Sequence, residues 1–92
     1  MDSSVTHNPA LNRFELKVGD ELALAYYKLE GDIVTLTHTE VPQALSGQGV
    51  GSRLAKGVFA HIRADGHKAV TQCSFMAAWA SRHPEVADLV VG

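Results

Sequence analysis

Three glycines at alternate positions, Gly47, Gly49 and Gly51, carry the clearest chemical signal in this 92-residue sequence. They lie between a run rich in β-branched residues and a run with helical periodicity. Glycine lets a backbone approach a ligand closely, and the first turn of a helix offers N–H groups without partners and about half a positive charge. The loop therefore predicts a site for an anion such as a pyrophosphate.

Two well-known nucleotide-binding loops do not match this segment. The dinucleotide pattern G-x-G-x-x-G requires a third glycine where Ser52 or Leu54 stands. The ATP-binding pattern G-x-x-x-x-G-K-[ST] requires a Gly-Lys pair where Ser52 and Arg53 stand. The sequence therefore favours neither Rossmann-type dinucleotide binding nor a magnesium–nucleotide complex.

His38 is the first candidate for proton transfer. A histidine side chain changes its charge near neutral pH, so it can take a proton from an ammonium substrate or a relay water. In a regular strand His38 shares a face with Val34 and Leu36, so a packed, hydrogen-bonded histidine is the alternative interpretation. Glu40 follows on that face, where it would orient His38 or attract an amine.

Cys73 is the single cysteine, and it precedes a short helix whose N-terminus favours a thiolate. The thiol is a candidate nucleophile, a proton donor to a leaving thiolate, or a wall of the pocket. The alternative is a small buried packing residue. With one cysteine, no disulfide forms within the chain, so we expect a reducing, cytoplasmic location.

The strands expected to position these residues are read from local patterns. Apolar and charged residues alternate over Arg13–Val18, and Leu22–Leu29 and the β-branched run Ile33–Val41 follow it. Lys68–Cys73 is expected to be the fourth strand. Because a helix separates it from the third, these two strands can run parallel through a right-handed crossover.

The helices follow from apolar periodicity and from their end signals. The crossover helix starts in the glycine loop and ends near Gly66, with apolar residues every four positions at Val50, Leu54, Val58 and Ile62. Ser74 is the expected N-cap of a short helix that packs Phe75, Met76 and Trp79 into the core. Pro84 begins a last helical turn.

Together these elements predict an α/β fold, with a mixed, mainly antiparallel four-stranded sheet, a crossover helix and C-terminal helical turns. Residues 1–10 are polar and rich in turn formers, so we expect a flexible N-terminal tail before one domain over residues 11–92. No stretch resembles an export signal or a membrane span, and a monomer is expected.

Charge and histidine spacing narrow the range of partners. The net charge of −2 argues against nucleic acid as a partner, because that binding needs a basic surface to neutralise phosphates. The remaining histidines are scattered at spacings unlike those of a zinc site, so no metal is expected.

The glycine loop resembles motif A of the GCN5-related N-acetyltransferases, a [QR]-x-x-G-x-[GA] signature between a strand and a helix. Here it reads Ser46-Gly47-Gln48-Gly49-Val50-Gly51. Ser46 replaces the usual Arg or Gln, which affects a side-chain contact to the phosphates but leaves the backbone cradle. With His38-Thr39-Glu40-Val41, Cys73 and His83-Pro84-Glu85, the chain is similar to the small, single-domain, YjdJ-type branch of that superfamily.

This resemblance implies an acetyl-CoA-dependent N-acetyltransferase acting on an amine of a small molecule or a protein. The pantetheine arm would lie between the splayed third and fourth strands and pair with the backbone of Thr39, Glu40 and Val41. The pyrophosphate would rest on the N–H groups of Gln48, Gly49, Val50, Gly51, Ser52 and Arg53. For the Arg53 side chain, a phosphate contact and a solvated position both remain open.

The family pattern also leaves the proton donor open. Larger relatives use a tyrosine on the helix after the fourth strand to protonate departing CoA, and Phe75–Arg82 contains none. Cys73 is the best local substitute, which also allows a two-step route through an acetyl-cysteine. A non-catalytic CoA-binding or protein-interaction module is the rival; it would keep the glycine cradle without needing a titrating His38 or an accessible Cys73.

Overall fold

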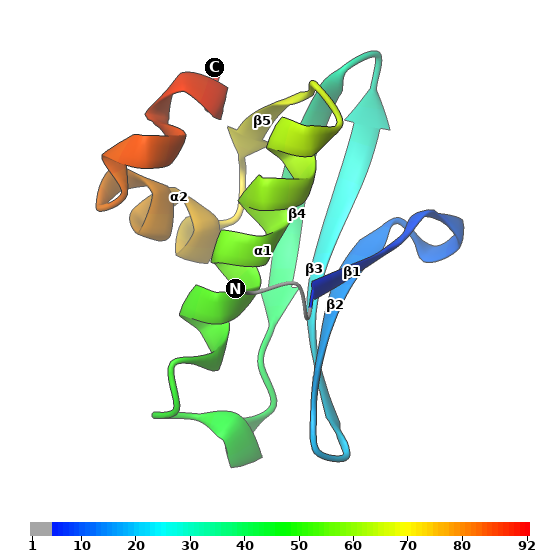
Figure 1. Ribbon diagram of the computed structural model, residues 1–92, viewed down its shortest axis with the longest axis vertical. Coiled ribbons are helices and arrows are strands. Elements are labelled where there is room, and N and C mark those ends of the chain that lie inside the picture. Colours follow the sequence, from blue (N-terminus) through cyan, green and yellow to red (C-terminus); the bar gives the residue numbers. More distant parts are fainter. Residues whose placement is uncertain (1–4) are drawn as a thin grey trace.

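The computed structural model of this chain describes residues 5–92 and shows one sheet with its helices on one face (Figure 1). The five strands follow one another in the order β1-β2-β3-β4-β5. The first four run antiparallel, and β5 runs parallel to β4. Their bounds are β1 Val5–Asn8, β2 Arg13–Val18, β3 Glu21–Glu30, β4 Ile33–Glu40 and β5 Lys68–Thr71. The expected α/β class, mixed pairing and crossover are confirmed.

The fifth strand, β1, corrects the prediction of a flexible tail over residues 1–10. The part of that prediction on residues 1–4 lies outside the described residues, but Val5–Asn8 pairs with β2. Val5 is buried against Gly57 of the crossover helix, where an added Cβ would lie 2.2 Å from a Val5 methyl carbon. His61 Nε2 also lies 2.8 Å from the Val5 carbonyl oxygen. These long-range contacts outweigh the polar composition of the segment.

Two α-helices and three short 3-10 helices complete the fold. The crossover helix α1 spans Val50–Ala64, beginning in the glycine loop as predicted, and α2 spans Ser74–Ser81. Cys73, not Ser74, is the N-cap of α2, because the Cys73 backbone is extended and its carbonyl accepts the Ala77 N–H at 3.0 Å. The 3-10 helices are η1 Pro9–Leu11, η2 Gln43–Leu45 and η3 Pro84–Leu89.

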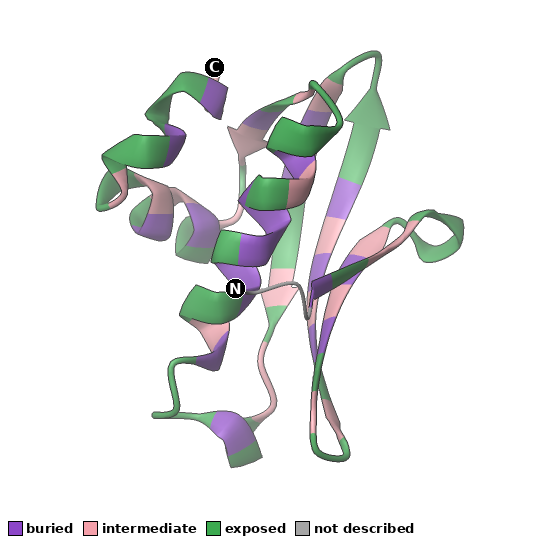
Figure 2. Ribbon diagram, viewed as in Figure 1, coloured by how far each residue is buried: buried purple, intermediate pink, exposed green. Residues whose placement is uncertain are grey.

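The core lies between the sheet and α1, and no helix of residues 5–92 covers the other face of the sheet (Figures 1 and 2). Met76 and Trp79 of α2 join this core as predicted. Phe75 does not, because the first turn of α2 lies beside the glycine loop rather than over the sheet; its side chain remains 37% exposed. Within residues 5–92, no helix is long and apolar enough to cross a membrane.

A β-bulge in β4 decides how the site is arranged. Leu36 pairs with Tyr27, but the next pair along the ladder joins His38 to Tyr26. Thr37 is therefore an extra residue on β4 with no partner position on β3. A bulge of this kind interrupts the alternation of side chains and bends the strand.

The bulge corrects the predicted face of His38. Paired residues share a face, so His38 lies beside Tyr26 on the uncovered face, whereas Leu36 is buried under α1. Thr39 pairs with the fully buried Ala25 and returns to the helix side. A strict period of two had placed His38 with Leu36, and the inserted Thr37 makes that assignment wrong.

Candidate functional site

The ladder between β4 and β5 stops halfway along β4. Its last pair is Leu36 with Thr71, and the Cys73 N–H then donates to the Leu36 carbonyl oxygen at 2.9 Å. In the part of the chain that the structure describes, no further backbone hydrogen bond reaches Thr37–Glu40 from this side. The second half of β4 thus has a free edge, in the place where the sequence predicts splayed strands.

A cleft of about 450 Å³ opens where these strands part. It runs from the free edge of β4 to the glycine loop and the first turns of α1 and α2. Its lining residues are Thr39, Val41, Leu45, Ser46, Gly47, Gly49, Val50, Gly51, Ser52 and Phe75.

Each glycine in the loop has its own structural reason. Gly47 and Gly49 have φ values of 78° and 71°, in the left-handed region that favours glycine, and Gly49 is the N-cap of α1. Gly51 is helical, but a Cβ there would lie 2.8 Å from Cζ of Phe75. Two glycines therefore shape the turn, and the third makes room for an aromatic ring.

The N-terminus of α1 points unpartnered donors at this cleft. Among residues 5–92, no backbone oxygen accepts from the N–H groups of Val50, Gly51 and Ser52, no side chain caps the helix, and its first turn holds no acidic residue. Unpaired N–H groups and the helix dipole both favour an anion. The space where a Gly49 Cβ would lie is open.

The structure brings together most of the residues predicted to bind a cofactor. Thr39, Val41, Gly49, Val50, Gly51 and Ser52 all line the cleft. Glu40, Gln48 and Arg53 do not line it. The Gln48 N–H donates to the Leu45 carbonyl and the Arg53 N–H to the Gly49 carbonyl, so neither is a free donor. A contact from the exposed Arg53 side chain stays a prediction.

Sequence reasoning missed Phe75 and the role of Ser52. No local pattern indicates that Phe75 covers Gly51, because the two residues are 24 positions apart. Trp79 Nε1 donates to Ser52 Oγ at 2.9 Å, which ties α2 to the start of α1. Both contacts fix how the glycine loop is presented.

Cys73 lies at the edge of this site, with its Sγ 3.2 Å from Thr39 Oγ1. Burial raises the pKa of the thiol, but the Thr39 hydroxyl and nearby backbone N–H groups, mostly in the first turn of α2, lower it further than burial raises it. The net pKa of Cys73 is below its usual value of 9.0, in the predicted direction.

His38 lies on the opposite side of β4 from Cys73. Its side chain is 61% exposed, and Nε2 lies 3.2 Å from Glu40 Oε2, so the contact suggested by the sequence is present. The imidazole stacks on Tyr26 with ring centroids 6.1 Å apart. The two candidate catalytic side chains are thus separated by the β4 backbone and reach a ligand from different faces.

No group of three or more His, Cys, Asp or Glu side chains within residues 5–92 is arranged to hold a metal ion. The groups that the described site presents are backbone donors, a thiol, a hydroxyl, an imidazole and a carboxylate.

Three comparisons with known proteins point to the same protein family. Residues 13–89 match the family model described as GCN5-related N-acetyl-transferase. The Mus musculus protein NATD1 is 29% identical over 83 residues, which cover 87% of this chain and 76% of NATD1. The solution NMR structure of a GCN5-like protein from Staphylococcus aureus aligns with a TM-score of 0.74 at 26% identity, covering 99% of this chain and 90% of that one. This protein belongs to the GCN5-related N-acetyltransferase family.

Proposed function

We propose that this protein binds acetyl-CoA in the cleft and transfers the acetyl group to an amine. The observation that carries the proposal is the position of the cleft, which joins the free N–H groups of α1 to the free edge of β4. Membership of the GCN5-related family supports the same reaction.

The residues of the cleft fit the parts of acetyl-CoA. The N–H groups of Val50, Gly51 and Ser52 suit the pyrophosphate oxygens, and the open space at Gly49 admits them. The free backbone groups of Thr39 and Val41 suit the amide groups of the pantetheine arm, as a sheet edge suits an added strand. When bound, acetyl-CoA supplies an acyl group activated as a thioester.

The chain supplies the proton transfers from two sides of β4. In this proposal Cys73, half-buried beside Thr39, donates a proton to the departing thiolate. His38, with Glu40, takes a proton from the incoming ammonium group on the other side of β4. The β4 backbone between them fixes the distance between the two groups.

Calorimetric titration with CoA tests this site, and the chain offers a matched pair of variants. Gly49 and Gly66 have φ values of 71° and 72°, and a Cβ at either meets nothing within 4 Å. Gly49→Ala and Gly66→Ala should therefore lose similar stability, about 1–2 kcal/mol each, the cost of a left-handed non-glycine residue. Only Gly49→Ala should also lose CoA affinity, because residue 49 lines the cleft and the added methyl group takes up space there. We expect a loss of roughly tenfold or more.

Equal CoA affinity in the parent and Gly49→Ala would contradict the assigned site. Release of free CoA from acetyl-CoA, measured with a panel of amines, tests the transfer. CoA binding without turnover on any amine would instead favour the non-catalytic CoA-binding module.

A further inference from the structure

Two rows of side chains cross the uncovered face of the sheet in register. In the first row, the Cα partners are Asn8, Arg13, Tyr26 and His38, one from each of β1 to β4. In the second row, they are Thr6, Glu15, Leu24 and Glu40. Both rows end on the half of β4 that has a free edge, and Thr39, on the other face of that half, lines the cleft.

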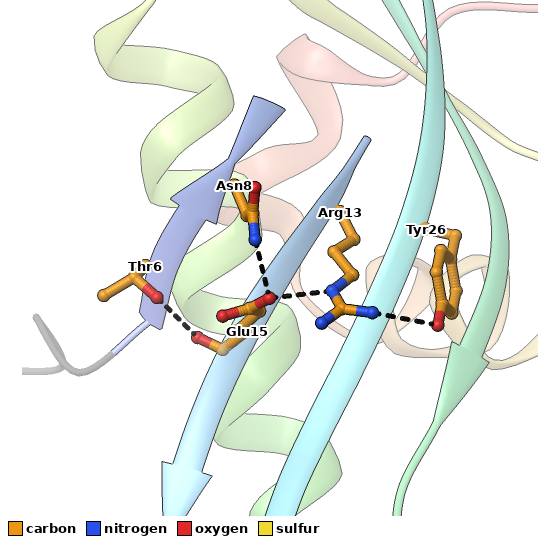
Figure 3. Close-up of polar contacts among 5 residues, drawn as sticks. All are labelled: Thr6, Asn8, Arg13, Glu15 and Tyr26. Carbon is orange, nitrogen blue, oxygen red and sulfur yellow. Dashed lines mark hydrogen bonds and ion pairs between the residues drawn. The ribbon is translucent and has the colours of Figure 1, made fainter. Parts of the chain in front are cut away.

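The first row is held by a polar network that Figure 3 shows. Glu15 accepts from Arg13 Nε at 2.7 Å and from Asn8 Nδ2 at 3.0 Å. Arg13 Nη1 in turn donates to the Tyr26 hydroxyl at 3.4 Å, and its guanidinium lies 5.9 Å from the Tyr26 ring centroid. Tyr26 is thereby fixed from β2, and its ring stacks on His38. Because Glu15 pairs with Arg13, the positive charge of this row is offset.

Two leucines of β3, Leu24 in the second row and Leu22 two residues before it, give this face an apolar strip beside β4. Leu24 stands beside Glu40 in the ladder and is only partly buried, and Leu22 is 39% exposed. Beyond them lies a hollow of about 520 Å³ lined by Thr6, Glu15, Lys17, Asp20 and Leu22. An extended chain that starts at Glu40 can therefore lie over two leucines and end in this hollow.

We infer that the acceptor is a protonated amine on an extended, largely apolar chain, and that it binds on this uncovered face. Glu40 and His38 receive the ammonium group, Tyr26 forms the aromatic wall of its site, and Leu24 and Leu22 contact the chain. Arg13 and Glu15 are positioning residues that hold Tyr26. This inference rests on the proposed function, because it supplies the acceptor for that reaction.

The physical chemistry of the site favours this class of ligand. A carboxylate and an aromatic ring side by side attract a cation, through an exposed ion pair and a cation–π contact. An apolar chain strengthens binding with each methylene group that it buries. From β4 to β2 the chain crosses two strand spacings of about 4.8 Å each, which a short compact amine does not span.

Amide-resolved NMR titration of the ¹⁵N-labelled protein tests the inference without turnover. The probe is hexylamine, with hexanol as its uncharged control and methylamine as its short control. We expect hexylamine to shift the amide signals of Leu24, Tyr26, His38 and Glu40, and both controls to bind at least twofold to threefold more weakly. Glu40→Gln should weaken hexylamine binding roughly two- to fivefold, the effect of losing one exposed ion pair.

Glu30→Gln is the matched control, since Glu30 is an equally charged, exposed residue at the far end of the sheet, paired with Lys28. It should leave hexylamine binding unchanged. Shifts confined to the cleft, equal binding of hexylamine and hexanol, or equal affinity in Glu40→Gln and the parent would each overturn the inference. A separate CoA titration of the same samples reports on the cleft alone, so a failure of the proposed function is distinguished from a failure of the acceptor site.

Discussion

The two halves of β4 use the same backbone for different purposes. Over Ile33–Leu36, the strand is paired on both sides, and Val34 and Leu36 are buried. Over Thr37–Glu40, it is paired with β3 alone, and three of the four residues are exposed. The first half thus stabilises the sheet, and the second offers free backbone groups to a ligand.

The change from two-sided to one-sided pairing occurs at Thr37. It shows how a small domain can form a site without removing residues from its hydrophobic core. An unpaired strand edge is normally a liability, because it can pair with another chain. Here the edge lies beside the glycine loop, where an extended ligand can cover it. The bulge also sends His38 and Glu40 to one face and Thr39 to the other, so one short segment presents side chains on both faces of the sheet.

Truncation in the paired half should have the largest effect, and it should be on stability. Leu36 is 1% exposed, so Leu36→Ala should lower the free energy of unfolding by about 2–5 kcal/mol, through lost burial and a cavity. Glu40→Gln in the free half should change it by less than about 0.5 kcal/mol, as exposed substitutions do. Urea unfolding followed by circular dichroism measures both. Equal losses would contradict the division of β4 into two halves.

Removal of the Cys73 thiol should have the next largest effect, and this effect should be on the rate of acetyl transfer. If Cys73 donates the proton to the leaving thiolate, Cys73→Ala should lower turnover by about 10²-fold while CoA still binds. Intact-mass analysis after acetyl-CoA alone distinguishes the routes: an acetyl adduct removed by hydroxylamine indicates a two-step transfer, and no adduct indicates direct transfer. Full activity in Cys73→Ala would show that Cys73 is only a packing residue.

His38→Gln tests whether the two faces of β4 have different functions. The side chain is exposed and lies away from the cleft, so stability and CoA affinity should match those of the parent. Turnover should fall on the order of tenfold or more, because a group that takes up a proton is lost. Thermal melting, CoA calorimetry and amine-dependent CoA release give the three values. Lost stability with unchanged turnover would favour a purely structural histidine.

Thr39→Val should give the smallest effect, a shift in the pH dependence of Cys73 alkylation. The thiolate is the reactive form, and the Thr39 hydroxyl helps to hold the pKa of Cys73 below its usual value. Without that hydroxyl the pKa should rise, so the midpoint of labelling by iodoacetamide should move to higher pH.

Thr35→Val, on the other face of the paired half, is the control and should not move this midpoint. CoA should protect the parent thiol from the reagent. A midpoint that is the same in Thr39→Val and the parent would show that the 3.2 Å contact with Cys73 has no influence on the thiol.

The sequence by itself determined the elements that local chemistry specifies. Alternation over Arg13–Val18, the four-residue period of α1 and the glycines before it predicted a strand, a helix and an anion-binding turn. The structure contains the strand, the helix and a left-handed glycine turn, and anion binding at that turn stays a prediction. These features depend on residues close together in the chain, so their patterns can be read without knowledge of the fold. The family resemblance rested on the same local motifs, and the family match confirmed it.

Only the tertiary structure decided the features that depend on distant residues. Val5 belongs to a strand because Gly57 leaves it room, and Phe75 borders the cleft because Gly51 lies beneath its ring. His38 faces away from Leu36 because the pairing with β3 leaves Thr37 as an extra residue. A period of two describes a regular strand, but a bulge is set by the partner strand, so the face on which His38 lies cannot be read from β4 alone.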